Sequence, residues 1–519
     1  MRPFVSQRSA LRGSVRRLTA AGLAVALALP LAGCLSNEIV PAAIDIPKAY
    51  RAGPRNADAA LPSVVWWRGF RSKELTDLIE EALTSNFDVA AAVARIVQAD
   101  AQSRIAGSAL LPIVDLNADA TRSVSSRTTG SRGVLGGVQS GGSSPSTDYA
   151  TALSASYEID FWGKNRAALR ATEELAVASR FDREVVALTT IVSVANSYFQ
   201  MLAAHDRLAI ARGNLAAATR VYDLIKQRFD VGTASALDLA QQESVVAQQR
   251  ASIPPLEQIL RQNVATLAVL IGRTPAAVRV RATSMSQIAI PPVTPGLPSD
   301  LIGQRPDIRE AEAQLASANA NVHNARAQFF PSITLTGVGG YQSSALRTLM
   351  RPESVFFNLA AGLVQPVLDG GRIQGNFDLQ KGRQDELLQL YRKAIVNGFA
   401  DVERALIAVQ QTARRVQLQR DVVASTRRAF EIAETRLREG TVDLVTVLNT
   451  QTALFQAQDA LAQAQLERLI AVVALFQALG GGWQAPRDDR PKVAELPRTP
   501  QEISFPVQDL PRFQGHWPR

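Results

Sequence analysis

Few residues in this sequence of 519 amino acids have types and spacing that could do chemistry. Asp115, Asn117 and Asp119 alternate as the first ligands of a calcium loop do, but the glycine and terminal glutamate that such a loop needs are missing. We interpret them as polar positions along a strand. No G-x-S-x-G, P-loop or C-x-x-C motif occurs, and the four methionines do not cluster. The three histidines are scattered: His205, His323 and His516. The sequence therefore predicts no enzymatic activity, no metal site and no cofactor.

Cys34 has the most specific predicted chemistry, which is lipid attachment. It ends the sequence LAGC, after a basic start and an apolar run too short to span a membrane and remain there. This pattern predicts that residues 1–33 are a lipoprotein signal peptide and that Cys34 becomes the acylated N-terminus. The alternative is a buried thiol after an ordinary signal peptide. As the only cysteine, Cys34 leaves no possible intrachain disulfide. Leu35, where an aspartate would indicate inner-membrane retention, favours the outer membrane.

Most of the positive charge of the chain lies in the predicted signal peptide. Five arginines lie there, so removing residues 1–33 lowers the formal net charge of +9 to about +4. No cluster of basic and aromatic residues remains to indicate nucleic-acid binding. No run of about 20 apolar residues follows the signal, so a chain that crosses a membrane would do so as strands.

One motif occurs twice and predicts two similar turns. RFDVGTASALDL begins at Arg228 and RLREGTVDLVTV begins at Arg436. Gly232 and Gly440 can adopt the left-handed conformation that ends a helix, and a following Thr or Ser can cap the next helix. We interpret each copy as the tip of an α-hairpin. The alternative is an ordinary turn between helices.

Long helices must flank these turns. Prolines crowd at 41–62, at 291–306 and after 486, leaving two long proline-free stretches rich in helix-forming residues, 146–253 and 367–485. From about 165 to 230, apolar residues recur about every 3.5 positions, which predicts a helix on the order of 100 Å long. A helix of that length needs neighbouring helices to pack against, as in a coiled coil.

The sequence is an internal duplication. Gly163 matches Gly371, and Gly272 matches Gly480, at the same offset of 208 residues as the two turns. Residues 86–112 match residues 305–331 at an offset of 219. The difference arises between positions 112 and 163, which include a Gly/Ser-rich stretch. An insertion there predicts an exposed loop.

Strands flank that loop. In residues 113–121 and 149–159 apolar and polar residues alternate, which is the period of a strand. Tyr149 and Tyr157 share one face about 26 Å apart, a spacing that suits the two aromatic girdles of a membrane barrel. The second repeat supplies 332–341 and 356–364. The alternative is a soluble sheet covered by helices. Four strands cannot close a barrel, and lipid does not tolerate open edges, so a membrane-spanning sheet requires oligomerisation.

Together these features resemble the outer-membrane factors of the TolC-like superfamily. The features are the lipid-attachment motif, WWRGF at 66–70, and two copies of helix, strand, loop, strand, long helix, Gly-Thr turn and return helix. The closest branch is the NodT-type lipoproteins of tripartite RND efflux pumps. The resemblance implies a mostly helical, duplicated protomer and a homotrimer with a 12-stranded β-barrel and a 12-helix periplasmic α-barrel. Pro254 and Pro255 would lie near an equatorial belt.

The resemblance also implies roles for the turns. Gly232, Thr233, Gly440 and Thr441 would form the periplasmic tips that dock a periplasmic adaptor. Asp238 matches an acidic gate position of the first hairpin, whereas the second hairpin has Thr446 and Asn449 where the best-known branch has aspartates. The alternative for Asp238 is a local helix cap or a solvated position. A gate without an acidic ring would rest on polar and apolar contacts.

We expect a passive outer-membrane exit duct for small molecules, loaded by an inner-membrane RND transporter through the adaptor. The alternatives are a type I secretion conduit and a structural coiled-coil lipoprotein without lipid-facing strands. The expected order is a signal peptide at 1–33, a linker at 34–72, a first repeat at 73–290, a second repeat at 291–483 and a Pro-rich tail at 484–519. In the first repeat, strands at about 113–121 and 149–160 precede a tip at 228–238; in the second, strands at about 332–341 and 355–365 precede a tip at 436–446.

Overall fold

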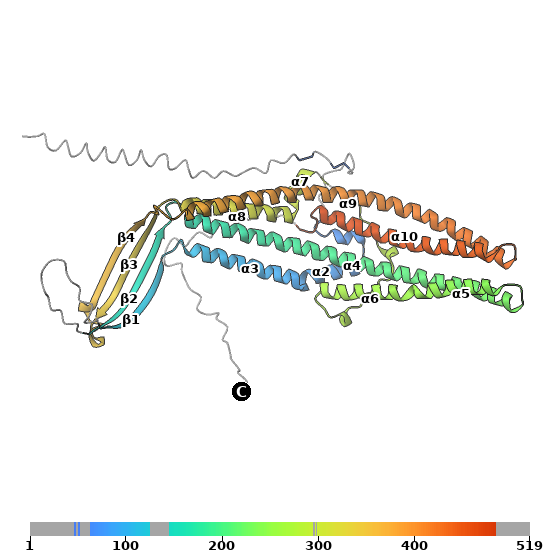
Figure 1. The fold of residues 1–519 in the computed structure, drawn as a ribbon, viewed down its shortest axis with the longest axis horizontal. Helices are drawn as coiled ribbons and strands as arrows, with labels where there is room; N and C mark the ends of the chain where they lie inside the picture. Colours follow the sequence, from blue (N-terminus) through green and yellow to red (C-terminus); the bar gives the residue numbers. More distant parts are fainter. Residues whose placement is uncertain are drawn as a thin grey trace, which may run out of the picture. The chain divides into compact units, whose positions relative to one another are not determined.

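A computed structural model describes residues 46–47, 50–51, 63–124, 145–293, 296 and 298–483. The predicted signal peptide, Cys34, most of the Gly/Ser-rich loop and the C-terminal tail lie outside these residues. The described chain is mostly helical and contains one four-stranded sheet (Figure 1).

The helices fall into two matching sets, one in each half of the chain. The first set is α2 (Lys73–Ser85), α3 (Phe87–Ser108), α4 (Lys164–Asp230), α5 (Ala236–Ala251) and α6 (Ile253–Leu270). The second is α7 (Pro298–Gln304), α8 (Pro306–Ala327), α9 (Arg372–Arg438) and α10 (Leu444–Ala478). Short 3-10 helices lie at Trp66–Phe70, Pro275–Ala277, Met285–Gln287, Leu346–Thr348 and Pro352–Ser354.

The two sets repeat the offsets found in the sequence. Helices α4 and α9 both have 67 residues and begin 208 positions apart, and α3 and α8 both have 22 residues and begin 219 positions apart. At about 1.5 Å per residue, α4 and α9 are each on the order of 100 Å long. The return helices differ, because α5 ends at Ala251 just before Pro254 and Pro255, which lie in the first turn of α6, whereas α10 is continuous.

The strands form one antiparallel sheet in chain order: β1 (Ile113–Ser123), β2 (Ser146–Ile159), β3 (Ser332–Ser343) and β4 (Val355–Val364). Leu116 pairs with Leu153, Leu153 with Gly339, and Gly339 with Phe357. β1 and β4 therefore form the two edges of the sheet. Since β2 leads into α4, the sheet and the Gly232 turn lie at opposite ends of that helix (Figure 1).

The main core lies around the WWRGF segment. Trp66, Trp67 and Phe70 are buried, and the Trp66 ring stacks on Phe476 with ring centroids 4.7 Å apart. The middle of α4 contributes several of its largest side chains, among them Tyr198 and Phe199. Part of α4 is long and apolar enough to cross a membrane by length and composition, but 67% of that stretch is buried inside the protein. We therefore read it as a core helix.

The end of each return helix contacts the start of a 22-residue helix, α6 that of α3 and α10 that of α8, and we call each of these contacts a joint. Asn86 donates from Nδ2 to the Leu270 carbonyl, and Arg305 donates from Nη1 to the Ala478 carbonyl. Gly272 and Gly480 follow these carbonyls with positive φ, and an added Cβ would lie 2.3 Å and 2.7 Å from carbonyl oxygens. Only glycine fits both the conformation and the close approach.

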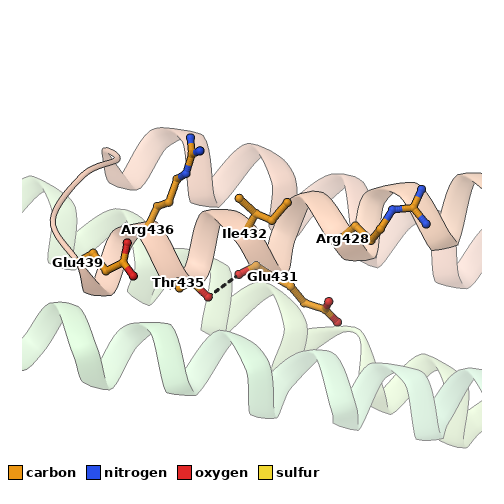
Figure 2. Close-up of a pocket in the computed structure, with 6 residues that line it drawn as sticks. All are labelled: Arg428, Glu431, Ile432, Thr435, Arg436 and Glu439. Atoms are coloured by element: carbon orange, nitrogen blue, oxygen red, sulfur yellow. Dashed lines mark hydrogen bonds between the residues drawn. The ribbon is translucent and has the colours of Figure 1, made fainter.

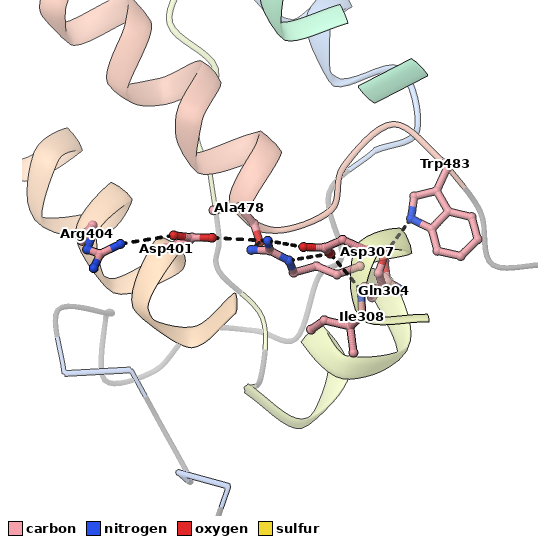
Figure 3. A network of polar contacts seen from close by, with 8 residues as sticks. Gln304, Asp307, Ile308, Asp401, Arg404, Ala478 and Trp483 are labelled. Carbon is pink, nitrogen blue, oxygen red and sulfur yellow. Dashed lines mark hydrogen bonds and ion pairs between the residues drawn. The ribbon is translucent and has the colours of Figure 1, made fainter. Parts of the chain in front are cut away.

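In the second repeat this joint includes a charge network (Figure 3). The Arg305 guanidinium pairs with Asp307 at 2.7 Å and Asp401 at 3.3 Å. Burial lowers the pKa of Arg305, but hydrogen bonds to the two aspartates and their charges outweigh burial and raise it. The network joins α8, α9 and the end of α10, so the hairpin of the second repeat is anchored far from its tip.

Candidate functional site

The two surfaces with unusual composition are the sheet and the hairpin tips. Residues opposite each other in antiparallel strands point to the same side of a sheet. The register therefore assembles one face from Val114, Leu116, Ala118 and Ala120 and the positions paired with them. None of these positions carries a charged side chain. The paired positions are Tyr149, Thr151, Leu153, Ala155, Gly337, Gly339, Tyr341, Ser343, Val355, Phe357 and Leu359.

Nothing in the described chain covers this apolar face. Leu116 is 72% exposed, and Phe357 and Leu359 are each 80% exposed. The opposite face is more polar; Asp115, Asn117 and Asp119 belong to it, and Asn117 donates to the Ser154 hydroxyl at 2.9 Å. A soluble sheet with helices over its apolar side is therefore not what forms. One uncovered apolar face and one polar face suit a sheet between lipid and a water-filled channel.

Tyr149 and Tyr157 both lie on the apolar face, towards the two ends of β2. Arg122 is on the same face, two residues beyond Ala120 and so past the level of Tyr149. A cation at that level can extend towards a membrane interface. The placement is compatible with the predicted aromatic girdles, which stay a prediction.

The two predicted tips are turns of the same geometry. Gly232 has φ +77° and Gly440 has φ +70°, both left-handed, and an added Cβ at either would meet nothing within 4 Å. Thr233 donates from its backbone N–H and its hydroxyl to the Arg228 carbonyl. Thr441 donates in the same way to the Arg436 carbonyl. The threonines thus close the ends of α4 and α9, and the glycines allow the reversal.

Asp238 forms a helix cap. Its carboxylate accepts from the backbone N–H and hydroxyl of Ser235, and its own N–H donates to the Ser235 hydroxyl. This is a capping box at the start of α5. The alternative reading of Asp238 as a local cap therefore describes its contacts within the chain.

The second hairpin places its acid three residues earlier. Asp443, which corresponds to Ser235, caps α10 by accepting from the Thr446 N–H at 2.9 Å. Hydrogen bonds from Thr446 lower the pKa of Asp443. Thr446 and Asn449 are exposed. Both hairpins thus carry a capping carboxylate, but at different positions, which a search for aspartates at matching positions misses.

Arg228, the first residue of the repeated motif, connects the two hairpins. Its guanidinium donates to the Leu437 carbonyl and, at 3.1 Å, to the Arg438 carbonyl at the end of α9. A cation at this end of a helix satisfies unpaired carbonyls and the negative end of the helix dipole. Sequence reasoning found Arg228 and Arg436 as parts of a repeat but assigned them no role; their matching position before each glycine was the signal.

A buried pair of side-chain amides lies between the two hairpins, a few helical turns from the tips. Gln242 on α5 and Gln451 on α10 are both fully buried, in contact with the apolar cluster formed by α4, α5, α9 and α10. Gln242 donates to the Ala218 carbonyl at 2.8 Å and to the Gln451 side-chain oxygen at 3.5 Å. The remaining Gln242 oxygen and Gln451 nitrogen have no partner among the described residues. The hairpins are therefore held by apolar contacts and an incompletely satisfied polar pair.

An exposed face of α9 near its tip is hollowed (Figure 2). Its residues recur every three or four positions along the helix, so they share one side. Ile432, at its centre, is 56% exposed. The lining residues are Arg428, Glu431, Ile432, Thr435, Arg436 and Glu439.

The described residues contain no group of three or more His, Cys, Asp or Glu that could hold a metal ion. Burial and the nearby Arg326 and Arg170 lower the pKa of His323. The arrangement therefore consists of packing, capping and surface features.

Comparison with known proteins decides the family. The family model described as outer membrane efflux protein matches residues 78–273 and 297–481, which together form most of the chain. The chain belongs to the outer membrane efflux protein family. It is an outer-membrane component of an efflux system. This match confirms the family resemblance stated from the sequence, and similarity to solved outer-membrane channels confirms the predicted TolC-like fold class.

Individual members of the family are similar over most of their length. The pyoverdine export outer membrane protein OpmQ of Pseudomonas aeruginosa is 42% identical over 423 residues, covering 81% of this chain and 88% of OpmQ. The toluene efflux pump outer membrane protein TtgF of Pseudomonas putida is 33% identical, covering 89% and 96%. The solved CmeC outer membrane channel of Campylobacter jejuni is 25% identical with a TM-score of 0.80, covering 87% and 96%.

Proposed function

We propose that three copies of this chain assemble into a single conduit, with twelve strands forming a barrel in the outer membrane and twelve helical rods forming a tube in the periplasm. The observation that carries the proposal is the open four-stranded sheet, whose apolar face is uncovered and whose edges β1 and β4 are unpaired within the chain. In lipid an unpaired edge is prohibitively costly, so β1 of one copy pairs with β4 of the next until the barrel closes.

The conduit is passive. Its energy comes from an inner-membrane RND transporter that loads small molecules, and a periplasmic adaptor links that transporter to the hairpin tips. The tip turns at Gly232-Thr233 and Gly440-Thr441 serve as the docking surface. Asp238, Thr446 and Asn449 belong to the gate region, where closure rests on helix packing and polar contacts. Two of the relatives are named for pyoverdine export and for toluene efflux, which supports small molecules as cargo.

Cys34 anchors the mature chain to the outer membrane by acylation, in addition to the barrel. A Cys34→Ser variant should incorporate no labelled palmitate and should retain the uncut signal peptide, whereas the native chain should be labelled. Equal labelling of both chains would contradict the anchor but would leave the barrel untouched.

The decisive experiment is isolation of the native chain from outer membranes, without boiling, followed by bilayer recording and adaptor capture. We expect an SDS-resistant, heat-modifiable trimer with β-sheet signal, discrete channel currents, and crosslinks from the tip turns to an adaptor of an RND system. A monomer without channel currents would refute the conduit. Capture of an adaptor from a type I secretion system would refute the RND assignment.

A further inference from the structure

The inference concerns Arg436, the counterpart of Arg228 in the second hairpin. The internal offset of 208 residues relates α4 to α9 over their full length. If α4 contacts the second hairpin, the repeat predicts that α9 makes an equivalent contact with the next hairpin around the tube. The described part of the chain contains no further hairpin, so that counterpart is missing within it.

The hollowed face of α9 is the missing half of such a contact. Its residues correspond to positions 220, 223, 224, 227 and 228 of α4 and to position 231 just after that helix. On α4, Leu224 packs against the apolar cluster at the tips, and Arg228 is half-buried while it donates to the end of α9. On α9 the matching Ile432 and Arg436 are exposed (Figure 2).

Donor and acceptor are both unused in the single chain. The Arg436 guanidinium has no hydrogen bond or ion pair with any residue of the described chain. The Asp230 carbonyl also has no hydrogen-bond partner among the described residues. The equivalent carbonyl in the second hairpin, that of Arg438, accepts from Arg228. Charge also favours this pairing. Arg228 lies beside the like-charged Arg438, whereas a guanidinium at the end of α4 would lie beside the carboxylate of Asp230.

We propose that Arg436 of one copy caps the end of α4 in the next copy, by donating to the Phe229 and Asp230 carbonyls, and that Ile432 packs against that copy's first hairpin. The occupant of the hollowed face is therefore a second copy of this chain. The inference rests on the proposed trimer. It identifies a contact between named residues at the closed periplasmic end of the tube. Around that end, three Arg228 caps within subunits alternate with three Arg436 caps between subunits.

The two kinds of cap would affect different movements at the periplasmic end of the tube. An Arg228 cap is one contact between the two hairpins of one subunit, whereas an Arg436 cap is a contact between neighbouring subunits. An opening that separates subunits must therefore remove Arg436 from the end of α4.

The first test is thiol crosslinking of the full-length trimer in outer membranes with a short bis-maleimide. The test pair is Arg436→Cys with Asp230→Cys, and the matched pair is Arg228→Cys with Arg438→Cys. We expect the test pair to give covalent dimers and trimers. The matched pair should crosslink within one chain, so the subunit should keep the mass of a monomer on a denaturing gel. Its two thiols should then no longer react with a second thiol reagent. Each single variant controls for Cys34.

The second test is bilayer recording of Arg436→Ala, with Arg427→Ala as the control, because Arg427 is exposed on α9 but lies outside the hollowed face. Losing one net hydrogen bond per contact should raise the mean current of Arg436→Ala at least about fivefold, with the trimer retained. Arg427→Ala should behave as the native chain. The inference is overturned if the native chain forms an intact trimer but the test pair crosslinks within one chain, crosslinks to an adaptor or does not crosslink. These outcomes leave the proposed conduit unaffected. Equal currents for Arg436→Ala and the native chain also overturn it. The absence of any native trimer overturns the conduit itself.

Discussion

Placing a charge on the uncovered face of the sheet tests the membrane assignment most directly. Leu153 lies near the middle of β2, halfway between Tyr149 and Tyr157, and its side chain is 56% exposed in the single chain. It pairs with Leu116 and Gly339, so its neighbours offer no partner for a cation. If this face contacts lipid, Leu153→Arg places a guanidinium near the middle of the bilayer. The cost is about 2–4 kcal/mol per subunit, roughly a 30- to 1000-fold shift in the folding equilibrium.

The adjacent residue provides a matched control. Ser154 lies on the polar face, where its hydroxyl accepts from Asn117 and its strand neighbour is Asp115. Ser154→Arg introduces the same side chain one residue away, facing the channel and a carboxylate. We expect it to cost less than about 1 kcal/mol, because the side chain stays hydrated.

Urea unfolding of the trimer in lipid vesicles, followed by tryptophan fluorescence and by loss of the heat-modifiable band, measures both variants. The reasoning predicts a large loss of stability for Leu153→Arg and a small one for Ser154→Arg. Equal losses, or the larger loss at Ser154, would refute the assignment of the two faces. Because the variants share strand, depth and added side chain, no general effect of an added arginine explains a difference.

Three further predictions concern the tips, the joint and pH. Gly232→Val puts a β-branched residue at φ +77°, where strain of at least about 1–2 kcal/mol falls on the turn alone; export should drop in a complementation assay while the trimer persists, and unchanged export would count against the tip role. Gly480→Ala should lower the melting temperature more than Gly440→Ala, since both positions have positive φ but only Gly480 would place Cβ 2.7 Å from the Gln304 oxygen; equal losses would refute the close approach. Burial, with nearby aspartates, raises the pKa of Glu310 to about 7 from 4.5, so the folded state holds a proton that the unfolded chain has released and stability falls as pH rises across that window. Glu310→Gln should flatten the melting temperature between pH 5 and pH 8, and an unaltered slope would contradict the shift.

Some of the site was readable from the sequence because it depends on local physics. A glycine before a threonine at the end of a long helical pattern predicts a left-handed turn, and Gly232 and Gly440 form such turns. Alternation of apolar and polar residues predicts the two faces of a strand, and the side of Leu153 follows from that period alone. Duplication of the chain was visible because equivalent positions keep fixed offsets.

Contacts between distant segments were not readable in this way. Arg228 and Arg436 occupy the same place in the repeated motif, yet only the packing of α4 beside the second hairpin gives Arg228 a partner. The Ser235 hydroxyl and the Asp443 carboxylate accept equivalent hydrogen bonds, from the backbone N–H three residues later, so the two hairpins carry their capping carboxylates at different positions, Asp238 and Asp443.

The sequence by itself determined the elements, because helix length, strand period and turn conformation depend on neighbouring residues and on glycine, proline and threonine at particular positions. It also predicted that other copies are needed, because four strands cannot close a barrel. Tertiary structure alone decided which side chains meet: the register that joins four strands into one apolar face, the amide pair between Gln242 and Gln451, and the cap from Arg228 to α9. These contacts join residues up to 210 positions apart, and such pairings follow from how whole helices pack rather than from any local pattern.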